Sequence, residues 1–81
     1  MDYEILENII NKYYYPYHNV CDIYFVNTNN GEISLEYKYF DKEISSSILQ
    51  AQRIGIPISR YVNESRKIKI DKIIKNKNYG N

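Results

Sequence analysis

The dipeptide Asn30-Gly31 constrains the fold of this chain more than any other part of its sequence. It lies between two segments, 20–28 and 32–40, that are rich in β-branched and aromatic residues. Such a dipeptide is the strongest short-range signal of a β-hairpin, because a type I′ turn needs φ > 0 at both central residues. We therefore predict two antiparallel strands joined by a two-residue turn, with a register set by that turn.

This register divides the hairpin into two different faces. The first face should carry the core, because most of its residues are apolar or aromatic. Its members are Asp22, Tyr24, Val26, Thr28, Ile33, Leu35, Tyr37 and Tyr39. The second face is mixed, and we expect it to be either half covered by a helix or a docking face. Its pairs are Phe25 with Glu36, Ile23 with Lys38, and Cys21 with Phe40.

A helix is predicted before the hairpin, over residues 3–14. Asp2 is a suitable N-cap, and apolar residues recur after it at helical spacing. Pro16 disfavours helical backbone at Tyr15, so the helix should end near Tyr14.

Further helices are predicted after the hairpin. Asp41 can cap a helix over residues 42–54, and Gly55 can end it. Ser59 can cap the next helix, which should begin near Arg60.

The segment 67–77 fits two structures. Its alternation of Lys and Ile suits a strand, whereas Asp71 and the lysine-rich end favour a helix, which we prefer. The fold class is therefore predicted as α+β, with the order α-β-β-α-α. We expect a single domain over residues 1–77, followed by a tail at 78–81.

Composition restricts the classes of function. The 81 residues suffice for one domain, and 43% of them are hydrophobic, as in a globular chain. The single cysteine, Cys21, excludes an internal disulfide, and no apolar run is long enough for a signal peptide or a membrane span. We therefore expect a cytoplasmic protein, in the host cytoplasm if it is viral, that does not contact a membrane.

Groups suited to catalysis or metal binding do not converge in the sequence. His18 and Cys21 are the only soft ligands, and residues three apart on a strand point to opposite faces. The three glycines are scattered and form no phosphate-binding loop. We therefore expect no catalytic residue, no metal site, no cofactor and no enzyme activity.

Charge is distributed unevenly along the chain. Residues 1–41 carry two Lys/Arg against seven Asp/Glu, net −5, whereas residues 42–81 carry nine against three, net +6. Such asymmetry is typical of proteins that bind nucleic acid or a charged partner. The alternatives are that the two halves dock on each other within the fold, or that the basic segment is a solvated helix face. The candidate nucleic-acid-binding residues are Arg60, Arg66, Lys67, Lys69, Lys72 and Lys75.

Tyrosines cluster around Pro16 and predict an interface with another protein. They straddle a helix end, so their rings cannot all point inward, and exposed tyrosines are common interface anchors. Packing in the core is an equally weighted alternative. With acidic residues and the mixed hairpin face, they form the candidate protein interface. Its residues are Tyr13, Tyr14, Tyr15, Tyr17, Glu4, Glu7, Ile23, Phe25 and Glu36.

Residues 33–66 resemble the ribbon-helix-helix DNA-binding proteins. The resemblance depends on a strand up to Phe40, a helix between Asp41 and Gly55, and Ser59 at the start of the next helix. In that family the strand pairs with its twin in a dimer, and alternate side chains enter the major groove. The resemblance implies Ser34, Glu36 and Lys38 as base readers, with Ser59 capping a phosphate-binding helix.

The whole chain is similar in appearance to small inhibitors encoded by viruses and mobile elements, such as anti-CRISPR proteins. It shares with them a short length, acidic and basic segments and the lack of catalytic motifs. This resemblance implies a non-enzymatic regulatory protein that binds a nucleic-acid-processing complex through acidic residues and exposed tyrosines. The alternative, implied by the ribbon-helix-helix resemblance, is a homodimeric DNA-binding repressor.

Overall fold

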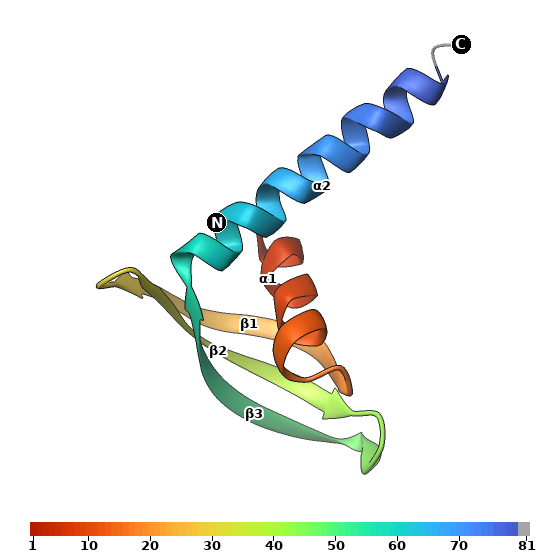
Figure 1. The fold of residues 1–81 in the computed structure, drawn as a ribbon. Coiled ribbons are helices and arrows are strands. Elements are labelled where there is room, and N and C mark those ends of the chain that lie inside the picture. The colour runs from red at the N-terminus through yellow and green to blue at the C-terminus, as the bar shows by residue number, and fades with distance from the viewer. Residues whose placement is uncertain (80–81) are drawn as a thin grey trace.

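The computed structural model describes residues 1–79, which form an α+β fold around one antiparallel sheet (Figure 1). The helical elements are α1 (Tyr3–Ile9), the π-helix η1 (Ile10–Tyr14) and α2 (Ile58–Tyr79). The strands are β1 (His18–Asn29), β2 (Glu32–Asp41) and β3 (Ser45–Pro57), in the order β1-β2-β3 across the sheet. No helix within residues 1–79 combines the length and hydropathy of a membrane span.

The hairpin of β1 and β2 confirms the prediction made from Asn30-Gly31. Both turn residues have positive φ, 53° for Asn30 and 77° for Gly31, as a type I′ turn requires. The predicted register holds from the turn as far as the pair of Phe25 and Glu36.

Two register shifts in β1 change its faces beyond that point. One of them leaves Tyr24 unpaired and places Ile23 opposite Tyr37. Ile23 is therefore buried and Tyr24 is 48% exposed, so the predicted faces of these two residues are wrong. The same change turns Asp22 away from the core. The physical reason is a bulge, which adds one residue to the strand and moves the side chains between it and the second shift, at Val20/Asp22, to the other face.

Residues 45–57 form β3, so the predicted helix over 42–54 is wrong. Asp41 does act as a cap, but its carboxylate accepts two backbone N–H groups of a turn, at 2.9 and 3.1 Å. From Leu49 to Pro57, β3 pairs with β2 without a shift, and the alternating residues Ile54 and Ile56 are buried. Pairing with β2 and burial of one face therefore override the local helical signals.

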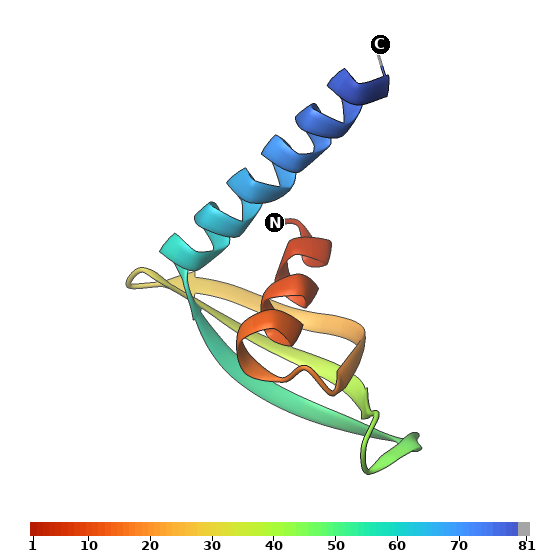
Figure 2. The same cartoon turned by 45° about the vertical axis from the view of Figure 1, so that its right-hand side comes forward.

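The helices α1 and η1 cover one face of the sheet (Figure 2). The predicted helix over 3–14 is confirmed in extent, although its C-terminal part is a π-helix. Asp2 caps α1 by accepting the backbone N–H of Glu4 at 2.9 Å. The core between helices and sheet consists of Ile5, Leu6, Ile9, Ile10, Ile23, Ile33, Leu35, Tyr37, Tyr39, Ile54 and Ile56. No helix within residues 1–79 covers the opposite face of the sheet.

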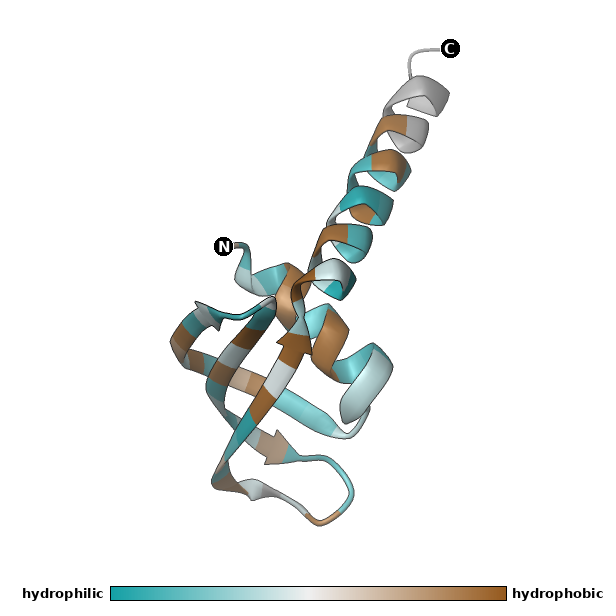
Figure 3. Cartoon of the chain, turned by 60° about the vertical axis from the view of Figure 1, so that its left-hand side comes forward, coloured by the Kyte–Doolittle hydropathy of each residue, from teal (hydrophilic) through white to brown (hydrophobic). Residues whose placement is uncertain are grey.

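The C-terminal helix α2 is one helix of 22 residues, which replaces the further helices predicted after the hairpin. It includes 67–77, where the preference for helix is confirmed, and it extends through Tyr79 into the predicted tail; residues 80–81 lie outside the described part. The backbone N–H of Ile58 donates to the carbonyl of Gly31 at 3.0 Å and positions its start. Farther along, α2 projects away from the sheet (Figures 1 and 2), and apolar bands interrupt its polar surface (Figure 3).

Candidate nucleic-acid interface

Glu64 anchors α2 to the N-terminal helical segment. Its side chain is buried, and its carboxylate accepts hydrogen bonds from the Tyr13 hydroxyl and from Lys12 Nζ at 3.1 Å. Lys67 Nζ lies 3.8 Å from the same carboxylate oxygen. The hydrogen bond from Tyr13, together with the two ammonium groups, lowers the pKa of Glu64. The buried carboxylate is therefore charged and paired at neutral pH.

Arg60 makes a second connection between α2 and the tyrosines. Its guanidinium carbon lies 4.5 Å from the ring centroid of Tyr13 and 5.6 Å from that of Tyr14. Arg60 Nη1 donates to the Tyr14 hydroxyl at 2.9 Å, and this hydroxyl donates to the carbonyl of Gly55 at 3.3 Å. The guanidinium is thus held in one place beside the first turns of α2.

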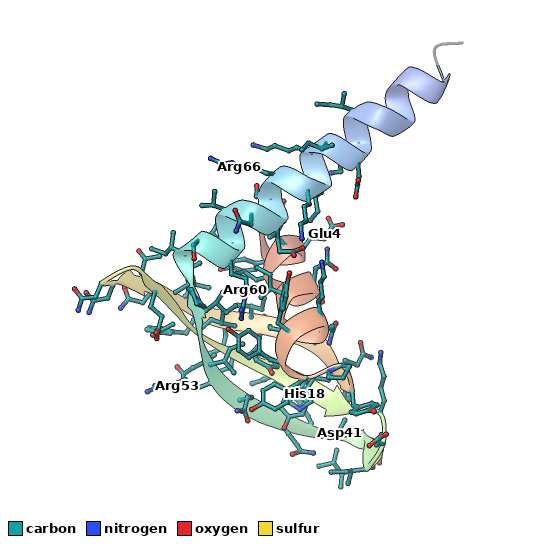
Figure 4. The ribbon with its side chains drawn as sticks, in the orientation of Figure 1. Glu4, His18, Asp41, Arg53, Arg60 and Arg66 are labelled. Carbon is teal, nitrogen blue, oxygen red and sulfur yellow. The ribbon has the colours of Figure 1, made fainter. Side chains whose placement is uncertain are left out.

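An open hollow lies next to these two connections. Its lining residues on α2 recur at helical spacing and so occupy one face of the helix. The lining consists of Tyr13, Pro57, Ser59, Arg60, Asn63, Arg66 and Lys67. Three of these residues are cationic and none is acidic. Figure 4 shows Arg60 between α2 and the sheet, and Arg66 directed away from the body of the molecule.

The hollow has the chemistry of a phosphate site. Guanidinium groups donate in a planar fork that matches a phosphate, and an ammonium group adds a mobile positive charge. Ser59 and Asn63 add a hydroxyl and an amide, which are common donors to nucleic-acid backbones. No acidic residue lines the hollow, and the Glu64 carboxylate beside it is buried and paired with Lys12 and Lys67.

The residues predicted to bind nucleic acid fall into three sets in the structure. Arg60, Arg66 and Lys67 come together in the hollow. Lys69 and Lys72 are exposed on α2 but do not line it. Lys75 belongs to α2, and its side chain lies outside the described part of the molecule.

The tyrosines of the predicted protein interface are mostly engaged within the molecule. Tyr13 and Tyr14 hold Glu64 and Arg60, as described above. Tyr15 stacks on His18 with ring centroids 4.3 Å apart. Tyr17 is half exposed.

The other residues of the predicted protein interface do not form one surface. Glu4 is exposed and Glu7 half-buried on α1, whereas Phe25 and Glu36 lie on the uncovered face of the sheet. Glu36 accepts from Arg53 Nη2 at 3.0 Å, and Ile23 is in the core. The acidic residues of the prediction therefore face opposite sides of the molecule.

His18 and Cys21 lie in different surroundings. His18 is buried, with Nδ1 2.8 Å from the Tyr37 hydroxyl, whereas Cys21 is exposed. Burial lowers the pKa of His18, and the carboxylate of Asp41 partly opposes this effect. Within residues 1–79, no group of three or more His, Cys, Asp or Glu side chains is arranged to hold a metal ion.

Comparison with family models, curated proteins and solved structures found no match to this chain.

Four lining residues of the hollow were not among the predicted nucleic-acid-binding residues, namely Tyr13, Pro57, Ser59 and Asn63. Ser59 and Asn63 lie four positions apart and precede Arg66 and Lys67 at helical spacing, so a helical projection of the sequence shows them on one face. Tyr13 was predicted only as part of a protein interface. Its place beside Arg60 depends on the packing of η1 against α2, which no local pattern reveals.

Proposed function

We propose that this chain is a non-enzymatic regulatory protein that binds a nucleic acid through the basic face of α2. The observation that carries the proposal is the hollow beside Tyr13, which gathers Arg60, Arg66 and Lys67 without an acidic residue. The acidic residues, by contrast, are divided between two faces, which weakens the case for a single acidic surface that enters a basic cleft.

The expected mode of binding is contact with the phosphate backbone. Arg60 and Arg66, together with Lys67, whose ammonium group also pairs with Glu64, predict a salt dependence of binding. The logarithm of the binding constant should fall with the logarithm of salt concentration with a slope between roughly −2 and −3. Backbone contacts carry little sequence information, so affinity should be modest and similar for unrelated sequences. The Tyr13 ring lies under the Arg60 guanidinium, so this side of the hollow presents a positioned cation for a phosphate.

Arg66→Ala tests the proposal most directly. Arg66 lines the hollow and is exposed, so its loss should leave the fold intact. We expect affinity for random duplex DNA to fall roughly five- to tenfold and the salt slope to weaken by about one unit. Fluorescence anisotropy over a series of salt concentrations measures both quantities.

Lys42→Ala is the matched control for this experiment. Lys42 is an exposed cation in the turn between β2 and β3, outside the hollow, and its removal changes the net charge by the same amount. We expect Lys42→Ala to bind like the unaltered chain. Equal losses in the two variants, or no binding by the unaltered chain at low salt, would refute a site on α2.

One observation supports a second candidate function, an inhibitor that binds a nucleic-acid-processing protein. The uncovered face of the sheet presents half-exposed apolar residues, namely Tyr24, Phe25 and Leu49. Exposed aromatic residues on an open sheet are typical of protein interfaces. This candidate requires that the protein does not bind nucleic acid at low salt but inhibits a nucleic-acid enzyme. It also requires that Phe25→Ser abolishes the inhibition without changing the melting temperature.

A further inference from the structure

The two edges of the sheet differ in their protection against pairing with another strand. β1 carries two register shifts and the charged residue Asp22, and bulges and charges are common protections of sheet edges. β3 has a single irregularity, near its start, and from Ser45 to Gln52 it contains no charged residue and no proline. Among residues 1–79, no backbone hydrogen bond from outside the sheet reaches positions 47–54, and the Arg53 carbonyl accepts Nε2 of the neighbouring Gln52 at 3.4 Å.

The register shows which backbone groups this edge offers. In an antiparallel ladder, alternate residues bond to one neighbour, and the others direct N–H and C=O to the opposite side. The carbonyl of Gly55 accepts the Tyr14 hydroxyl and therefore points away from β2. Leu49, Ala51 and Arg53, at two-residue steps from Gly55, direct their N–H and C=O groups outward by the same alternation.

We propose that two copies of this chain join antiparallel along β3, around a two-fold axis at Ala51. The backbone N–H of each Ala51 then donates to the carbonyl of Ala51 in the other copy. Leu49 of each copy lies opposite Arg53 of the other. The result is one continuous sheet that contains the three strands of both copies. This dimer goes beyond the proposed binding of nucleic acid and does not depend on it.

A second copy fits this edge because the edge is self-complementary. The register centred on Ala51 places no like charges opposite each other, whereas a register centred on Arg53 would bring two guanidinium groups together. The Tyr14 hydroxyl on the carbonyl of Gly55 limits the seam at its C-terminal end. On the uncovered face, Leu49 of each copy would pack beside the aliphatic part of Arg53 from the other.

Sedimentation over a series of protein concentrations, with the full chain and two proline variants, tests the proposal. Proline is tolerated on an edge strand where the N–H faces outward, so Ala51→Pro should keep all bonds to β2 and remove two bonds across the seam. We expect the unaltered chain to sediment as a dimer, with twice the mass of one chain. Ala51→Pro should sediment as a monomer, with the mass of one chain. Thr28→Pro is the matched control, because Thr28 is exposed on β1 and its N–H also points away from β2.

Two further variants keep the proposal testable if Ala51→Pro fails to fold. Leu49→Lys places a lysine opposite Arg53 of the second copy and should also halve the sedimenting mass. In a Cys21→Ser background, Ala51→Cys should form a disulfide-linked dimer on mild oxidation, whereas Thr28→Cys should not. A monomeric unaltered chain at every concentration would overturn the proposal and leave the β3 edge to a strand of another protein. Dimers that survive Leu49→Lys, or the lack of a disulfide at position 51, would overturn it as well.

Discussion

His18 lies between two tyrosine rings in the interior of the protein. The ring centroid of Tyr15 is 4.3 Å away on one side and that of Tyr39 is 3.6 Å away on the other. Burial raises the pKa of the Tyr37 hydroxyl, so this group keeps its proton and can donate it to His18 Nδ1. Burial also removes water from the charged imidazolium, so the site favours the neutral imidazole and the pKa of His18 is lowered.

A lowered pKa predicts that the protein loses stability in mild acid. Above the ordinary pKa of 6.5, His18 is neutral in both the folded and the unfolded chain, and its contribution to stability is fully present. Below that pH the unfolded chain binds a proton first, so stability falls as the pH drops toward the folded pKa. Between pH 7.5 and 5.5, we expect the free energy of unfolding to fall by at most about 1.4 kcal/mol. Urea unfolding at the two pH values measures this loss.

His18→Gln is the control for this pH dependence. Glutamine keeps an acceptor for the Tyr37 hydroxyl and does not titrate, so the variant should be less stable than the unaltered chain but nearly constant between the two pH values. An equal acid loss in His18→Gln would show that another group causes it.

At the scale of the elements, local signals predicted the hairpin of β1 and β2 but not the third strand, β3. Asn30-Gly31 needs only its own backbone to form the turn, so the hairpin follows from sequence. The bulge at Tyr24 has no such local signature, because an ordinary residue occupies it. Asp41 and Gly55 suit the ends of a helix, but residues 45–57 form a strand, because β2 provides hydrogen-bond partners and the helices α1 and η1 provide a core.

Two isoleucine substitutions distinguish the strand β3 from the predicted helix. In the strand, Ile54 is 9% exposed and packs in the core, whereas Ile48 is 58% exposed. A helix over 42–54 would instead place Ile48 on one apolar stripe with Ile44 and Ala51. We expect Ile54→Ala to lower the free energy of unfolding by about 2–4 kcal/mol and Ile48→Ala by no more than about 0.5 kcal/mol. Urea denaturation of the two variants measures this difference, and the reverse ranking would contradict the strand.

At the scale of the whole molecule, the candidate site combines what sequence predicts with what only packing creates. Arg60, Arg66 and Lys67 share one helix, so a basic surface there follows from the sequence alone. Tyr13 reaches that surface from the other end of the chain, through a hydroxyl that donates to Glu64. A contact between residues 51 positions apart depends on the complete fold.

Tyr13→Phe tests whether this contact attaches α2 to the rest of the molecule. The substitution keeps the ring beneath Arg60 and removes only the hydrogen bond to the Glu64 carboxylate. We expect the free energy of unfolding to fall by about 1 kcal/mol and the pKa of Glu64 to rise, because the Tyr13 hydroxyl is the main cause of its lowering. Urea unfolding and an NMR titration of the Glu64 carboxyl measure the two effects.

Tyr17→Phe is the matched control, because Tyr17 is half exposed and lies outside this network. Removal of its hydroxyl should change neither quantity. In Tyr13→Phe, the remaining bonds that hold α2 are those of Glu64 and Arg60 near its start. Hydrogen exchange in this variant should therefore accelerate in the first turns of α2 more than in the sheet. Uniform acceleration across the sheet and α2 would mean that Tyr13 supports the fold as a whole and does not act as the specific attachment of the basic helix.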